Sequence, residues 1–413
     1  MSTVLNIIAA AVNGVVAIPA AVVSLEILAA LPKRQKRDAA IVIARPPVAV
    51  LVPAHNEHDT ITATVARLIK QLRPDDRLLV VADNCTDDTA ALARAAGAEV
   101  LERHNLVERG KGFALDAGRQ HLAADPRPVL VIVDADVRLT DGSLDRLAAT
   151  AAGKQKPVQG VYLLRQAANV EHQNPISMLA FQVRNYVRPF GLYRLGGPCP
   201  LFGAGMAFPW AIIKDAPLAS PHLTEDVALA LDLACVGHSP ILCPDALIEG
   251  DSAPTSAASE KQRKRWEHGH LSLITSAAPK TLLRGLTRGR LSAVALALDV
   301  MVPPLSLLVM SVTAAAVFTN LLALTGLISF GVALIPTIAM LSVVTMVITA
   351  SIRFGEKGQR MRQLIAMAKY ATGKFPIYTT FLFKRQKTWE RTDRAPQPPA
   401  PTPRNPRNPK KAA

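Results

Sequence analysis

The stretch Val48-Ala-Val-Leu-Val-Pro-Ala-His-Asn-Glu57 decides the fold, because a short apolar run ends directly in a polar turn. The same pattern returns at 78–82, 99–101 and 129–133. Residues 60–71 and 87–96, which lie between these runs, have the apolar spacing and the starting residues of helices. Alternating strands and helices predict an α/β domain with a mostly parallel sheet.

Polar clusters follow three of the predicted strands. Glu57 comes after the first strand, Asp83 after the second, and Asp134 and Asp136 after the fourth. Ligands bind beyond the carboxyl ends of the strands in such sheets. Two carboxylates one residue apart suit Mg²⁺ or Mn²⁺ that takes its other ligands from phosphate oxygens. A single cluster is better explained by a turn, but three in order favour a site.

Long apolar stretches lie on either side of this domain. Residues 4–31 are long enough to cross a bilayer, and the basic cluster 33–37 follows them. A second apolar region divides at Pro303-Pro304 and Thr325-Gly326 into spans at 302–324 and 328–350. The positive-inside rule then predicts that the central domain faces the cytoplasm. The predicted domains are a transmembrane helix at 1–32, the cytoplasmic domain at 33–250, an interfacial segment at 251–290, two transmembrane helices at 291–352 and a basic tail at 353–413.

Charge and cysteine content exclude several classes of protein. The net charge is +15, but residues 353–413 alone hold fifteen Lys and Arg against three acids. A basic tail is typical of contact with anionic lipid headgroups, whereas a nucleic-acid-binding protein carries its charge on the folded domain. The four cysteines show neither a disulfide framework nor the spacing of a zinc site. A transporter is disfavoured because no ion pair is evident within the spans.

Two further motifs stand later in the chain, Thr224-Glu225-Asp226 and Gln262-Arg263-Lys264-Arg265-Trp266. Together with the earlier clusters, and in the same order, they make residues 47–270 resemble the family 2 glycosyltransferases, which are inverting enzymes of the GT-A fold. The similarity is strongest to the membrane-bound processive branch that includes cellulose, chitin and hyaluronan synthases. The resemblance therefore implies a cytoplasmic GT-A domain joined to about three transmembrane helices and to interfacial amphipathic helices.

The resemblance also implies roles for individual residues. It assigns the ribose and base of a nucleotide-sugar to Glu57 and Asp83, the first position of an Asp-x-Asp motif to Asp134, and the metal to Asp136. Asp226, with Glu225 beside it, corresponds to the catalytic base. The three motif residues Gln262, Arg265 and Trp266 correspond to the group near the diphosphate and the acceptor. Ala82 and Cys85 stand where the family commonly has Asp and Ser, which leaves the identity of the nucleotide open.

The chemistry of sugar transfer explains these residue types independently. A departing nucleoside diphosphate gains negative charge, which a metal ion neutralises and Arg265 can stabilise by charge-assisted hydrogen bonds. A carboxylate at Asp226 can remove the proton of the acceptor hydroxyl. The alternative for Asp226 is a helix-capping acid, since an apolar helical run follows it.

Three other features have two interpretations each. Lys111, in a Gly-rich turn before a helix, either binds donor phosphate with help from the helix N-terminus or belongs to a surface turn. Residues 203–206 either let the backbone approach the sugar or form a tight loop. Segments 251–290 and 359–385 are expected to include amphipathic interfacial helices. His268 and His270 are expected to face solvent or lipid rather than bind a metal.

The sequence thus predicts a multi-pass protein of the inner membrane that transfers a hexose from a nucleotide-sugar, expected to be a UDP-sugar, to a growing polysaccharide. The expected cofactor is Mg²⁺ or Mn²⁺. The expected partners are a glycan or lipid-linked acceptor, the bilayer and polysaccharide-export proteins, and no nucleic acid is expected. Two alternatives remain open: a transferase that adds a single sugar to a polyprenyl phosphate, and a non-catalytic scaffold of a polysaccharide complex.

Overall fold

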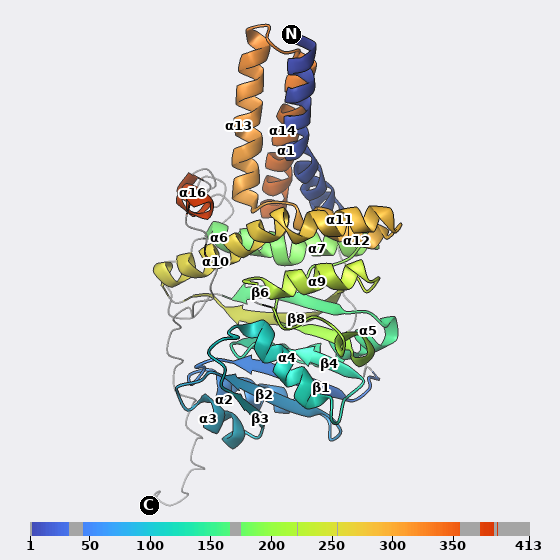
Figure 1. Cartoon of the computed structure of the whole chain (residues 1–413), viewed down its shortest axis with the longest axis vertical. Coiled ribbons are helices and arrows are strands. Elements are labelled where there is room, and N and C mark those ends of the chain that lie inside the picture. Colours follow the sequence, from blue (N-terminus) through green and yellow to red (C-terminus); the bar gives the residue numbers. More distant parts are fainter. Residues whose placement is uncertain are drawn as a thin grey trace, which may run out of the picture.

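The computed structural model describes residues 2–32, 44–165, 175–220, 222–253, 255–355, 372–383 and 386. From top to bottom, Figure 1 shows three long helices, a layer of shorter helices beneath them, and an α/β domain. The basic cluster 33–37, more than half of the predicted interfacial segment 359–385 and about three quarters of the tail 353–413 lie outside the described residues.

The first half of the sheet follows the sequence prediction. Its strands are β1 Val48–Ala54, β2 Arg77–Asp83, β3 Glu99–Arg103 and β4 Val129–Ile132, and its helices are α2 Ile61–Ile69, α3 Thr89–Ala95 and α4 Lys111–Leu122. All pairings among these four strands are parallel. Alternate β1 residues pack in two separate cores, Val50 on one face and Leu51 on the other. Burial on both faces explains why the strand is apolar without alternation.

The second half of the sheet contains both parallel and antiparallel strands. Its elements are β5 Val137–Leu139, α5 Ser143–Lys154, β6 Val158–Arg165, β7 Met206–Pro209, α8 Trp210–Ile213, α9 Glu225–Cys235 and β8 Ile241–Asp251. The eight strands lie in the order β3-β2-β1-β4-β7-β6-β8-β5. Strand β7 is antiparallel to both β4 and β6, and β5 is antiparallel to β8. The predicted α/β class with a mostly parallel sheet is confirmed, but the sequence did not predict these antiparallel strands.

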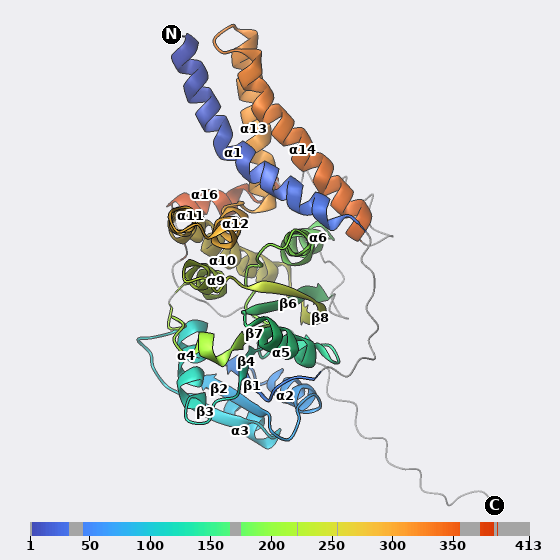
Figure 2. The ribbon, with the colours of Figure 1, turned by 90° about the vertical axis from the view of Figure 1, so that its right-hand side faces the viewer.

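Three helices are long and apolar enough to cross a membrane: α1 Ser2–Ala30, α13 Leu305–Leu324 and α14 Phe330–Phe354. Helices α13 and α14 closely match the predicted spans. Figure 2 shows α1 and α14 descending side by side to the helical layer, where they pack against each other. Residues 291–300 form a separate shorter apolar helix, α12 Leu291–Val300, in the layer below.

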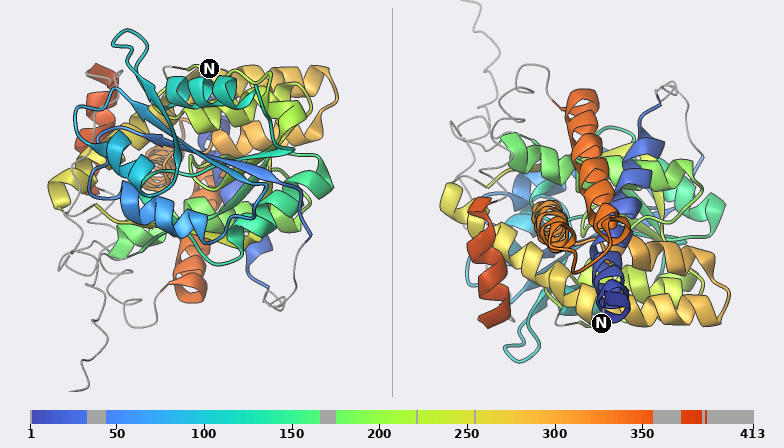
Figure 3. Two further views of the ribbon diagram at one scale, coloured as in Figure 1. Left: turned by 90° about the horizontal axis from the view of Figure 1, so that it is seen from below. Right: turned by 90° about the horizontal axis from the view of Figure 1, so that it is seen from above.

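A layer of short helices separates the three long helices from the sheet. Its members are α6 Pro175–Gln182, the π-helix η1 Val183–Val187, α7 Arg188–Arg194, α10 Ser256–Thr275, α11 Ala277–Thr287 and α12, with α16 Phe375–Phe383 beside them. Seen from above in Figure 3, α10 and α11 run beneath the long helices and α16 lies alongside α10. The helical character predicted for residues 251–290 is therefore present in α10 and α11.

A buried ionic group ties α1 to this layer. Arg188 Nε donates to Glu26 Oε2 over 2.6 Å, and Arg188 Nη2 donates to Asp299 Oδ1 over 2.6 Å. All three residues are buried. One turn later, a Cβ added at Gly191 would lie 1.8 Å from the carbonyl oxygen of Glu26, so α7 touches the backbone of α1 directly. The sequence prediction that the spans carry no ion pair is wrong for Glu26.

Candidate active site

The loops after β1 and β2 are joined by hydrogen bonds. His55 Nδ1 lies 2.7 Å from the carbonyl oxygen of Asp83. The amide of Glu57 donates to Thr89 Oγ1, and Thr60 Oγ1 donates to Glu57 Oε2 over 2.9 Å. Glu57 and Asp83, the two predicted nucleotide contacts, are therefore held by neighbouring loops at the carboxyl edge of the sheet.

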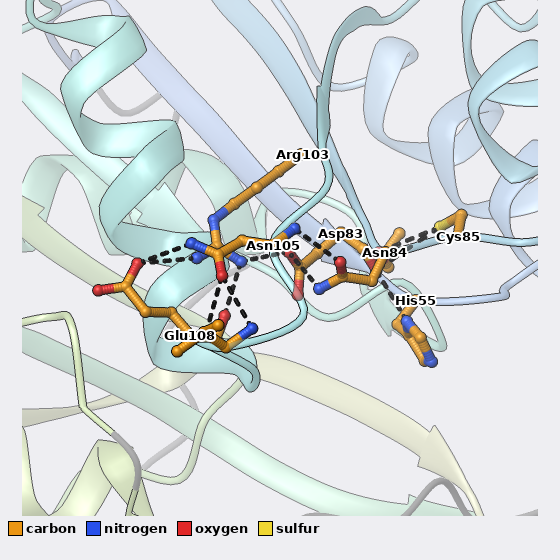
Figure 4. A network of polar contacts seen from close by, with 9 residues as sticks. His55, Asp83, Asn84, Cys85, Arg103, Asn105 and Glu108 are labelled. Carbon is orange, nitrogen blue, oxygen red and sulfur yellow. Dashed lines mark hydrogen bonds and ion pairs between the residues drawn. The ribbon is translucent and has the colours of Figure 1, made fainter.

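A third loop, after β3, supports Asp83 from the other side (Figure 4). Arg103 Nη1 donates to Asp83 Oδ1 over 2.7 Å and also to the carbonyl oxygen of Glu108. Asn105 receives a bond from Glu108 N and donates to Asn84 through its own backbone amide. Arg103 was not predicted from the sequence, because nothing near a basic residue at the end of a strand indicates which acid it will contact.

The central feature of the site is a cluster of one lysine and three acids. Lys111 Nζ lies 2.5 Å from Asp134 Oδ1 and 3.9 Å from Glu225 Oε1, and it donates to the carbonyl oxygen of Gly203 over 2.8 Å. A Cβ added at Gly203 would meet Lys111 Nζ at 3.1 Å and Asp226 Oδ2 at 3.3 Å. Residues that stand far apart in the sequence thus converge on the backbone of Gly203.

Glycine is required at this point of convergence. Gly203 has φ +82°, which other residues rarely adopt, and its missing side chain leaves space between Lys111, Asp134 and Asp226. Gly205 also has a positive φ, +67°, so residues 203–206 form a tight loop, and a close approach of its backbone to the sugar stays a prediction. Lys111 is no surface turn residue, because its side chain is largely buried among acids.

Burial and mutual repulsion control the charges of this cluster. Burial, followed by the neighbouring Asp226, raises the pKa of Glu225 to about 7, although Lys111 opposes the shift. Burial also raises the pKa of Asp226, with Lys111 and Arg184 acting in the opposite direction. Burial tends to lower the pKa of Lys111, but Asp134 and Glu225 outweigh it, so the pKa of Lys111 is raised. Lys111 therefore stays charged and stabilises the ionised acids around it.

The raised pKa of Glu225 predicts a pH-dependent stability. The ordinary pKa is 4.5 and the folded-state pKa is about 7, so the stabilisation is complete below pH 4.5 and is lost as the pH rises through 7. Glu225→Gln removes this titration. Its melting temperature relative to wild type is expected to rise by a few degrees between about pH 5 and pH 8. Scanning fluorimetry of the full chain across this range measures the difference.

Glu260→Gln at an exposed position of α10 controls for the loss of an acidic charge. The difference between its melting temperature and that of wild type should not rise with pH. A Glu225→Gln curve parallel to that of wild type over the whole range would contradict the raised pKa.

The carboxylates of the site suit a divalent cation that would take most of its ligands from a bound substrate. Asp134 and Asp136 follow β4 in one short loop, whose Ala135 carbonyl accepts a bond from Thr64 Oγ1 over 2.8 Å. Within the described part of the chain, no group of three or more His, Cys, Asp or Glu side chains gathers around a possible metal position. Two carboxylates match Mg²⁺ or Mn²⁺ that completes its octahedron with diphosphate oxygens and water.

Helix α10 brings the Gln-x-x-Arg-Trp motif to the same region. A Cβ added at Gly269 would lie 2.7 Å from Thr224 Cγ2, so α10 packs closely against the residue that precedes Glu225. One turn earlier, the Trp266 ring lies 5.7 Å from that of Phe181 on α6. Gln262 and Trp266 line a cavity between α6, η1, α10 and the start of α13, whereas Arg265 is not among the residues that line it.

Two histidines of α10 occupy positions that the sequence analysis did not predict. His268 and His270 are both buried, so the prediction that they face solvent or lipid is wrong. His268 Nε2 lies 2.9 Å from the carbonyl oxygen of Ile377 on α16, and His270 Nε2 lies 2.9 Å from that of Val302. Burial, and then nearby Arg184, lowers the pKa of His270 to about 3. These histidines serve to pack α10 against its neighbours.

Comparison with known proteins gives the family. The family model described as "Glycosyltransferase like family 2" matches residues 46–269, more than half of the chain. An uncharacterized glycosyltransferase of Mycobacterium tuberculosis is 32% identical over 122 residues, which cover 28% of this chain and 51% of that protein. A probable glycosyltransferase of Bacillus subtilis is 26% identical over 248 residues, which cover 54% of this chain and 55% of that protein. The chain spans about half the length of these curated relatives.

A solved structure matches nearly the whole chain. The mannosyltransferase from Pyrobaculum calidifontis, in complex with GDP-Man and Mn²⁺, superimposes with a TM-score of 0.50 at 17% identity and covers 92% of this chain and 95% of that chain. At this identity the similarity shows the fold alone. The expected GT-A fold is thereby confirmed.

Proposed function

Because the chain belongs to the glycosyltransferase like family 2, we propose that it transfers a sugar from a nucleotide-sugar to an acceptor that reaches the site from the membrane side. The observation that carries this proposal is the convergence of Lys111, Asp134 and Asp226 on the backbone of Gly203. The cation can stabilise the negative charge of a departing diphosphate, and an acid can accept the proton of an attacking hydroxyl. Gly203, which has no side chain, leaves space for the sugar between these groups.

In this proposal each group has one task. Glu57 and Asp83 hold the nucleoside, Asp134 contacts the donor, and Asp136 would hold a divalent ion, which would neutralise charge on the leaving diphosphate when bound. Lys111 keeps Asp134 and Glu225 in place and adds positive charge beside the phosphates. Asp226 accepts the proton of the acceptor hydroxyl as the hydroxyl attacks the anomeric carbon, so the reaction inverts the configuration. Gln262, Arg265 and Trp266 position the diphosphate and the acceptor.

The membrane arrangement is part of the proposal. We assign residues 1–32 and the two long helices within 291–352 to the membrane-spanning part, residues 33–250 to the catalytic domain, 251–290 to an interfacial segment and 353–413 to a basic tail. The basic cluster 33–37 and the basic tail support a cytoplasmic domain at the inner membrane. A UDP-sugar is the proposed donor. Repeated addition to a polysaccharide, with export proteins as partners, is supported by the Gln262–Trp266 motif and the similarity to the processive branch.

Donor binding tests the proposed function. The full-length protein in detergent is titrated by calorimetry with UDP-, GDP- and dTDP-sugars, each with Mn²⁺ and with EDTA. We expect one nucleotide-sugar, a UDP-sugar, to bind at least about tenfold more tightly with Mn²⁺ than without it, because a bound ion would neutralise charge on the diphosphate. Absence of binding by all three nucleotides would favour the scaffold alternative. Product length with labelled donor then separates repeated from single addition.

A further inference from the structure

A second polar site lies above Asp226, in the cavity between α6, η1, α10 and the start of α13. Its volume is about 170 Å³. The cavity is lined on one side by apolar residues, among them Leu164, Met178, Phe181, Val302 and Leu305. Leu305 begins α13, one of the three helices long enough to cross a membrane. The cavity therefore adjoins the start of α13, and Arg184 on its wall is near enough to Asp226 to act on its pKa.

Four cations line this cavity, and two of them already have acidic partners. Arg188 is bound by Glu26 and Asp299. Lys374 is paired with Glu267, the acid on the cavity wall. The charges of these two cations are therefore compensated within the fold.

Arg184 and Arg263, the other two cations, have no carboxylate within ion-pair distance among the described residues. Among the described residues, Arg184 Nη2 lies 3.4 Å from Nδ1 of His270. Burial lowers the pKa of its guanidinium, and Asp226 opposes the shift from beyond ion-pair distance. Arg263 Nη1 donates to the hydroxyl of Ser177 over 3.1 Å. Its Nε and the hydroxyl of Ser252 are both buried and without a hydrogen-bond partner in the described part of the chain.

Buried donors without partners are costly and call for an acceptor. Arg184, Arg263 and Ser252 all line one cavity, and two of them carry charge. A neutral saccharide would be matched by paired acids and amides rather than by two guanidinium groups that have no carboxylate within ion-pair distance. An anion with about two negative charges, such as a phosphate, compensates both arginines and accepts hydrogen bonds in several directions.

We infer that Arg184, Arg263 and Ser252 form an anion subsite that holds the phosphate of an amphiphilic, lipid-linked acceptor. The apolar wall and the start of α13 receive the lipid chain. The sugar attached to the phosphate extends past Trp266 so that its hydroxyl reaches Asp226. This inference rests on the proposed function and specifies the acceptor for the same site.

Direct binding tests the inference without relying on turnover. The full-length protein in neutral detergent is titrated by calorimetry with dodecyl phosphate, dodecanol and inorganic phosphate. Dodecyl phosphate is expected to bind at least about tenfold more tightly than either of the other two, because charge-assisted hydrogen bonds and chain burial act together. Arg184→Gln and Arg263→Gln should each weaken its binding by about tenfold or more. Arg184→Lys and Arg263→Lys, which keep the charge, should recover part of the loss.

Lys261→Gln is the matched control, since Lys261 lies on α10 but is exposed and outside the cavity. Equal binding of dodecanol and dodecyl phosphate, or unchanged binding in both arginine variants, would overturn the inference. If inorganic phosphate bound as tightly as dodecyl phosphate, the inference that the phosphate belongs to a lipid would be wrong. UDP binding with Mn²⁺ is measured on every variant. If the wild type binds UDP but not dodecyl phosphate, only the inference about the acceptor is wrong. If the wild type binds neither, the proposed function is wrong as well.

Discussion

Asp226→Asn is expected to lower the rate of sugar transfer by about 10²- to 10⁴-fold, the usual contribution of a general base. Asparagine preserves the shape of the side chain and cannot accept the proton. Asp226 Oδ1 also accepts a bond from the amide of Val227 over 2.8 Å, which the amide oxygen of asparagine can still accept. Donor binding should therefore stay close to that of wild type. The melting temperature should not fall, because burial raises the pKa of Asp226 and its charge is unfavourable to folding. A single-turnover assay with labelled donor measures the loss of rate.

Asp232→Asn provides the control within the same helix, because Asp232 lies on the exposed side of α9. It should transfer sugar at the wild-type rate. If Asp226→Asn retained more than about a tenth of the wild-type rate, Asp226 would be a helix-capping acid in the first turn of α9. The catalytic base would then have to be sought elsewhere.

Asp136→Ala is expected to abolish the effect of Mn²⁺ on donor binding. In wild type, Mn²⁺ should strengthen UDP binding by tenfold or more, since a metal ion contributes several kcal/mol to the stabilisation of phosphate charge. In the variant, the affinity for UDP with Mn²⁺ should fall to the value that wild type shows in EDTA. Calorimetric titration with UDP under both conditions measures this.

Asp141→Ala is the matched control, because Asp141 is exposed and follows β5, which runs antiparallel to β8 and so leads away from the edge that carries Asp136. Its binding of UDP should depend on Mn²⁺ as that of wild type does. Persistence of the full Mn²⁺ effect in Asp136→Ala would show that the ion is held elsewhere.

The sequence predicts those parts of the fold that depend on local pattern. Strand β1 is recognisable because both of its faces are buried, which leaves an uninterrupted apolar run from Val48 to Val52. The long apolar helices are recognisable for a similar reason, since they have to be apolar around much of their circumference. The acidic residues at the strand ends are also visible, because parallel strands bring their carboxyl ends to one edge.

Other parts depend on contacts between distant residues and leave no local signal. The antiparallel strand β7 has only four residues, Met206–Pro209, and its direction is set by its neighbours β4 and β6. The burial of His268 depends on α16, which lies more than a hundred residues later. Arg184 lies in a π-helix, and nothing in the sequence distinguishes it from a surface arginine. The role of Arg184 becomes evident only from its position near Asp226 and the cavity.

The contact between Glu26 and Arg188 also has a consequence for how the protein is made. Glu26 leaves the ribosome early, and its cationic partner is synthesised 162 residues afterwards. Asp299 follows 111 residues after Arg188. During translation α1 therefore cannot make this contact until α7 has been synthesised, and the ionic group is complete only after α12, which follows every strand of the described sheet. The packing of α1 against the helical layer thus waits until the α/β domain has been made.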